Sequence, residues 1–103
     1  MRRIIDRKIY DTEEATLLAE YWNGLGTGDF KSISEDLYIT SKGQFFLHCS
    51  GGALTKYAET NGKQTWGSQT IIPLDRNATY SWLEKNNEVE VIEEYFNDFI
   101  EEA

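Results

Sequence analysis

The sequence has 103 residues, a length typical of one domain, and its 40% hydrophobic and 14% aromatic content excludes wholesale disorder. Its 18 acids and 10 bases give a net charge of −8, which disfavours direct binding to DNA or RNA and favours a basic partner. No apolar run approaches the roughly 18 residues needed to cross a bilayer, and no apolar segment of a secretion signal follows the basic start. We therefore expect a soluble cytoplasmic protein that does not contact a membrane.

The N-terminal half predicts a strand followed by a helix. Residues 3–10 are rich in isoleucine and predict the strand. Asp11 is a helix N-cap candidate, and four apolar residues follow at helical spacing. These four residues predict an amphipathic helix over 12–23. They are Ala15, Leu18, Ala19 and Trp22.

A loop and a hairpin come next. The glycines of 24–34 predict the loop. Residues 37–40 and 45–49 predict the two arms of the hairpin, joined by a turn at 41–44. Residues 53–59 are expected to form a short helical turn or an irregular connection.

The following segment predicts a third strand and a second helix. The strand covers 66–72 and is closed by Pro73. Asp75 is an N-cap candidate for the helix, and Asn86 with Asn87 marks its end. The apolar stripe of this helix consists of Ala78, Trp82 and Leu83.

The last element is predicted to be an amphipathic helix over 88–101. One face is apolar and carries Val89, Ile92, Tyr95, Phe96, Phe99 and Ile100. The opposite face is acidic and carries Glu90, Glu93, Glu94, Asp98 and Glu101.

Together these elements predict a single α+β domain over 1–103. We expect a small antiparallel sheet of three or four strands packed by three helices, with the acidic amphipathic helix at the C-terminus. Trp66 and Trp82 are the expected core residues. The remaining aromatics are also expected in the core, with exposed partner anchors as the alternative, and include Tyr21, Trp22, Phe30, Tyr57 and Tyr80.

The charge is concentrated at the two ends of the chain. Residues 1–8 hold four bases and one acid, whereas residues 88–103 hold seven acids and no base. An acidic segment of this kind usually forms a solvent-exposed face that keeps the protein soluble. Because a whole helix face here lacks lysine, partner binding is a stronger alternative than for an ordinary acidic segment. The candidate partner-binding residues are Glu90, Glu93, Glu94, Asp98, Glu101 and Glu102.

No residue pattern indicates catalysis. His48 and Cys49 are neighbours in a predicted strand, so their side chains point to opposite faces and do not form a nucleophile–base pair. A lone cysteine makes no internal disulfide or multi-cysteine zinc site, and no carboxylate spacing matches a calcium loop. We expect no enzyme activity, cofactor or metal site. The glycines of 24–28 and 50–53 are interpreted as turns, not phosphate loops.

Six stretches of the sequence stand in order along the chain: 8–15 (KIYDTEEA), 35–40 (EDLYIT), 42–47 (KGQFFL), 51–58 (GGALTKYA), 71–74 (IIPL) and 82–84 (WLE). Together they resemble a group of small, mostly uncharacterised proteins from phages and mobile elements of Gram-positive bacteria. The resemblance covers most of the chain in order. The sequence departs from the group in its longer acidic C-terminal helix. The resemblance implies a context in which anti-defence proteins such as anti-CRISPRs are common, and it assigns no site residues.

The sequence therefore predicts an acidic, protein-binding inhibitor of phage or mobile-element origin, similar in role to an anti-CRISPR. Its acidic face would act as a DNA mimic and block a basic nucleic-acid-binding surface of a host defence complex, such as a CRISPR effector. The first alternative is a structural or regulatory interaction module without enzymatic activity that forms homo- or hetero-oligomers. The second alternative is a small enzyme that uses Cys49, His48 or an acidic pair.

Overall fold

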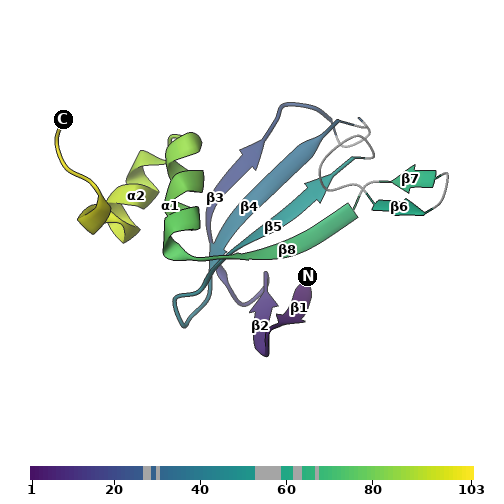
Figure 1. Cartoon of the computed structure of the whole chain (residues 1–103), viewed down its shortest axis with the longest axis horizontal. Coiled ribbons are helices and arrows are strands. Elements are labelled where there is room, and N and C mark those ends of the chain that lie inside the picture. The colour runs from purple at the N-terminus through teal and green to yellow at the C-terminus, as the bar shows by residue number, and fades with distance from the viewer. Residues whose placement is uncertain (27–28, 30, 53–58, 62–63, 67) are drawn as a thin grey trace.

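The computed structural model describes residues 1–26, 29, 31–52, 59–61, 64–66 and 68–103, and for 59–61 and 64–66 it describes the backbone alone. Within these ranges the chain forms eight strands, two α-helices and one 3-10 helix. Figure 1 shows the helices gathered at one end of a central sheet, with the N-terminal hairpin beside that sheet. No helix in the described ranges is long and apolar enough to cross a bilayer.

The central sheet has four strands in the order β3-β4-β5-β8, and every neighbouring pair is antiparallel. β5 is buried on both faces, because Phe45 and Leu47 face one side while Phe46 faces the other. The strands are β3 (Thr16–Trp22), β4 (Ile33–Ile39), β5 (Phe45–Gly51) and β8 (Ser68–Leu74).

Two short hairpins flank this sheet, β1 (Arg2–Ile5) with β2 (Lys8–Asp11), and β6 (Glu59–Asn61) with β7 (Gln64–Trp66). The β1–β2 turn has two residues, Asp6 and Arg7, and both have positive φ, as a tight type I′ turn requires. Tyr10 of β2 packs edge-on against Phe46 with the ring centroids 5.4 Å apart. This contact places the N-terminal hairpin on the sheet face opposite the helices.

The helices pack against the other face of the sheet, at one end of it (Figure 1). α1 (Arg76–Lys85) begins at Asp75, whose carboxylate accepts a hydrogen bond from the Ala78 N–H at 2.7 Å. α2 (Val89–Tyr95) and the 3-10 helix Asn97–Phe99 follow after Asn87, which adopts a positive φ. The buried residues at this interface are Ala19, Leu37, Phe45, Leu47, Cys49, Trp82, Leu83, Ile92 and Phe96.

A buried hydrogen bond ties α1 to the sheet. The Trp82 indole N–H donates to Oε1 of Glu35 at 3.0 Å, and Glu35 is only 6% exposed. A carboxylate is costly to bury unless hydrogen bonds replace water, so this contact fixes the position of α1 above β4.

The fold class predicted from the sequence is wrong. More of the described residues lie in strands than in helices, and they contain two α-helices, whereas the sequence predicts three. The error lies at 12–23, where Asp11 caps a single turn: its carboxylate accepts from the Glu13 N–H and its carbonyl from the Ala15 N–H, each at 3.0 Å. The chain then extends as β3, because β4 offers a partner strand and the aromatics at 21–22 favour extended backbone.

Other predicted elements fare differently. The hairpin predicted at 37–49 is confirmed, and its arms are longer than predicted. The Asp75 cap and the helix end at Asn86 and Asn87 are also confirmed. The last helix is shorter than predicted, since α2 ends at Tyr95, and Pro73 lies inside β8 and does not close it. Residues 53–58 of the connection predicted over 53–59 lie outside the described residues, and so do Phe30 and the side chain of Trp66.

We expect Trp82→Phe to lower the free energy of unfolding by about 1–3 kcal/mol, because Glu35 loses a buried N–H donor while most of the ring volume remains. Trp22 is 61% exposed, so Trp22→Phe is the matched control and should cost less than about 1 kcal/mol. Urea denaturation followed by circular dichroism measures both. Equal losses in the two variants would contradict a stabilising role for the buried bond.

Candidate functional site

The six acidic residues predicted to bind a partner lie at the C-terminal end of the molecule, and all six are exposed. They do not share one helix face, because the predicted long helix is divided into three parts. We call the set the acidic C-terminal surface. Its residues are Glu90, Glu93 and Glu94 on α2, Asp98 in the 3-10 helix, and Glu101 and Glu102 in the final segment.

Apolar contacts hold this surface in place from beneath. Ile92 and Phe96 are buried in the core, and the Phe96 ring lies 5.4 Å from that of Phe45 in β5. Phe99 packs edge-on against Phe96 at 5.3 Å, so the 3-10 helix is attached to the same cluster. The acids of α2 and the 3-10 helix are therefore displayed on a packed unit.

Arg76 joins the start of α1 to the 3-10 helix. Its guanidinium lies 4.7 Å from the ring centroid of Phe96 and 5.1 Å from that of Phe99. It also donates to both carboxylate oxygens of Asp98, at 3.2 and 3.4 Å. This ion pair is exposed and adds little stability, but it neutralises one charge of the acidic C-terminal surface. Asp98 is therefore a weaker partner-binding candidate than Glu93 or Glu94.

The other residues considered from the sequence are separated in the structure. Cys49 is buried beneath the helices, whereas His48 faces the opposite side and its Nε2 lies 3.1 Å from Oε1 of Gln69. Gly51 belongs to β5, and Ala53 lies outside the described residues. Within the described ranges, no cluster of three or more His, Cys, Asp or Glu is placed to hold a metal ion.

A row of titratable residues crosses the sheet on the face opposite the helices, and the sequence analysis missed it. Glu20 pairs with Asp36 across β3 and β4, and Asp36 pairs with His48 across β4 and β5. Cross-strand partners on one face have Cβ atoms about 4.5–5.5 Å apart. Only the strand register brings these residues together, and the erroneous helix at 12–23 concealed Glu20.

The environment of this row changes its acid–base properties. Burial raises the pKa of Asp36 above its usual value of 3.8, the Glu20 carboxylate raises it further, and His48 partly lowers it. Burial also raises the pKa of the Tyr38 hydroxyl, and the charges of Asp36 and Glu20 add to that shift. The environment of the row therefore favours the protonated forms of Asp36 and Tyr38.

The chain was compared with known protein families, curated proteins and solved structures. No protein-family model, curated protein or solved structure matches the chain.

We expect Asp36→Asn to stabilise the protein at pH 7. A raised pKa means that the native state holds the Asp36 proton more tightly than the unfolded chain, so ionisation costs stability as the pH rises through the native-state value. The advantage of the variant should shrink as the pH falls toward 3.8, where the unfolded carboxyl also becomes protonated. Thermal unfolding between pH 4 and 8 measures this difference.

Glu13→Gln is the control, because it removes one charge from an exposed position outside the row. It reports the general benefit of reducing the net charge of −8. A gain as large as that of Asp36→Asn, with the same pH dependence, would refute a local effect of the row.

Proposed function

We propose that this chain is a non-enzymatic inhibitor that binds a basic surface of a partner protein through its acidic C-terminal surface. The observation that carries the proposal is the exposure of all six acids of that surface, four of which lie on a unit anchored by Ile92 and Phe96. Complementary charge accelerates association and selects basic partners. Anchored side chains also lose less conformational freedom on binding than those of a disordered tail.

The partner that this charge pattern favours is a protein whose basic surface normally binds nucleic acid. The acidic C-terminal surface would occupy that surface as a DNA mimic, and a host CRISPR effector is the partner we expect from the resemblance to phage and mobile-element proteins. The protein would then act in the host cytoplasm without cofactor, membrane or direct nucleic-acid contact. The net charge of −8 supports this choice because it opposes direct binding to the phosphate backbone of nucleic acid.

The proposal is tested by pull-down and interference assays against effectors from Gram-positive hosts. We expect Glu93→Lys combined with Glu94→Lys to weaken binding by about tenfold or more, because both charges then oppose the basic partner. Glu13→Lys combined with Glu14→Lys changes the net charge equally at exposed positions outside the acidic C-terminal surface and should have a much smaller effect. Binding of the unmodified protein should also fall as salt rises.

Two results would refute the proposal in different ways. Binding that survives reversal of Glu93 and Glu94 would exclude the acidic C-terminal surface as the contact. Failure to bind or inhibit any effector in the panel would exclude the inhibitor role itself.

A homo-oligomeric interaction module is the second candidate, favoured by the exposed edge strand β3. Leu17 is 44% exposed and Trp22 is 61% exposed, and the outer edge of β3 has no partner strand among the described residues. Such an edge can pair with another chain. Light scattering discriminates the two candidates, since a stable dimer that Trp22→Ala dissociates would favour the module.

A further inference from the structure

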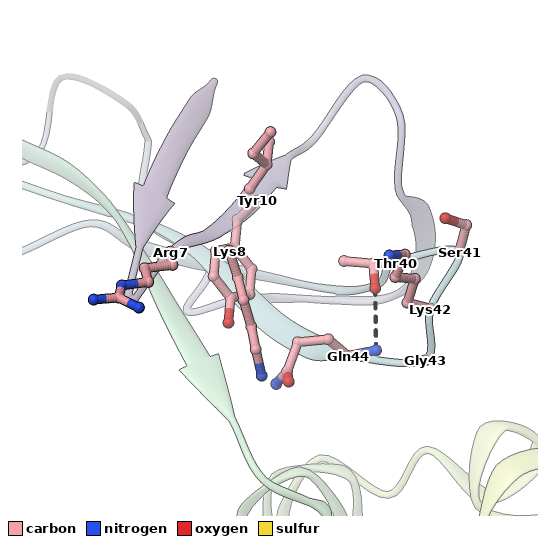
Figure 2. Close-up of a pocket in the computed structure, with 9 residues that line it drawn as sticks. Arg7, Lys8, Tyr10, Thr40, Ser41, Lys42, Gly43 and Gln44 are labelled. Atoms are coloured by element: carbon pink, nitrogen blue, oxygen red, sulfur yellow. Dashed lines mark hydrogen bonds between the residues drawn. The ribbon is translucent and has the colours of Figure 1, made fainter.

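A pocket of about 620 Å³ lies between the N-terminal hairpin and the turn that joins β4 to β5. Figure 2 shows that its lining comes from two segments distant in sequence, 7–10 and 40–44. Its volume falls within the range of about 300–1,000 Å³ that is typical of small-molecule sites. It is separate from the acidic C-terminal surface.

The charge of this pocket is opposite to that of the whole chain. Its lining includes three bases, Arg7, Lys8 and Lys42, and no acid. Arg7 and Lys8 belong to the basic N-terminal segment 1–8, and Lys42 comes from the turn that joins β4 to β5. Figure 2 shows the Lys8 side chain extending toward Gln44, whereas Arg7 points outward at the rim. The interior is therefore a place where an anion gains local electrostatic stabilisation.

Fixed backbone and side-chain contacts shape the two walls. On one side, the two-residue turn at Asp6 and Arg7 sets the start of β2, and the Tyr10 ring, 3% exposed, anchors β2 against Phe46. On the other side, the Gln44 side-chain amide donates to the carbonyls of Phe45 and Leu74, each at 3.0 Å. The pocket is thus held by contacts to the sheet on both sides.

Hydroxyl groups supplement the cations. Thr40 Oγ1 accepts a hydrogen bond from the Gln44 N–H at 3.1 Å, which orients the hydroxyl and leaves its own proton as a donor. Ser41 lines the same wall. Lysine, arginine and hydroxyl donors are the groups that proteins use to contact phosphate oxygens.

We propose that this pocket binds the phosphate groups of a small phosphorylated molecule. Lys8 and Lys42 supply the neutralising charge, and the Thr40 hydroxyl supplies a hydrogen-bond donor. The volume exceeds that of a single phosphate, so the ligand carries either several phosphates or one phosphate on a larger body.

In the test, the full chain is titrated separately with sodium pyrophosphate, with citrate, and with ATP in the absence of magnesium. Binding is measured by backbone amide NMR shifts and by calorimetry. We expect saturable shifts at 8–10 and 40–44 with pyrophosphate or ATP, and much weaker shifts with citrate. Lys8→Gln combined with Lys42→Gln should weaken binding by about tenfold or more. Lys31→Gln combined with Lys85→Gln is the control, since it removes equal charge from exposed positions outside the pocket.

The probes identify the source of the phosphate. Equal affinity for pyrophosphate and ATP assigns recognition to the phosphates alone, and tighter binding of ATP adds contacts to the nucleoside. The proposal is overturned if none of the probes shifts these amides, if citrate binds as tightly as pyrophosphate, or if both double variants lose affinity equally.

Discussion

Burial of one face of the four-stranded sheet beneath α1 and α2 is the contact on which the rest of the molecule depends. Leu37 of β4 and Phe96 at the end of α2 are both fully buried in this layer. Truncating a buried phenylalanine to alanine typically costs about 3–5 kcal/mol, so Phe96 alone contributes a large part of the stability of a small domain. Because Ile92 and Phe96 face the sheet, the glutamates between them face solvent.

The same packing explains how the charges are distributed over the molecule. α2 needs one apolar face to bury, and its remaining positions are almost entirely acidic. The N-terminal hairpin packs on the other face of the sheet through Tyr10, where bases surround the pocket beside the β4–β5 turn. The molecule therefore presents two surfaces of opposite charge, which suit two different kinds of ligand.

The parts of the fold that sequence reasoning predicted are those set by local signals. Asp75 caps α1 and the 37–49 hairpin forms because capping and turn preferences act over a few residues. The prediction of a helix at 12–23 was wrong because β3 is an edge strand with a register irregularity between Leu17 and Ala19. The irregularity interrupts the alternation of apolar and polar residues, so the apolar residues matched helical spacing by coincidence.

The candidate sites also differ in whether a local sequence pattern or tertiary pairing determines them. Exposure of Glu93 and Glu94 followed from their place in an amphipathic pattern, although the helix ends at Tyr95. The pocket between 7–10 and 40–44 and the row containing Asp36 arise from tertiary pairing, which no spacing along the chain encodes.

The central claim is that the acidic C-terminal surface occupies the place of nucleic acid on a basic partner, and competition binding tests it most directly. A fluorescent duplex that the effector recognises would be titrated against this protein at fixed effector concentration. The account predicts mutual exclusion: the protein displaces the duplex completely, and its own half-maximal concentration rises in proportion to the duplex present. A ternary complex that contains effector, duplex and this protein together would contradict it.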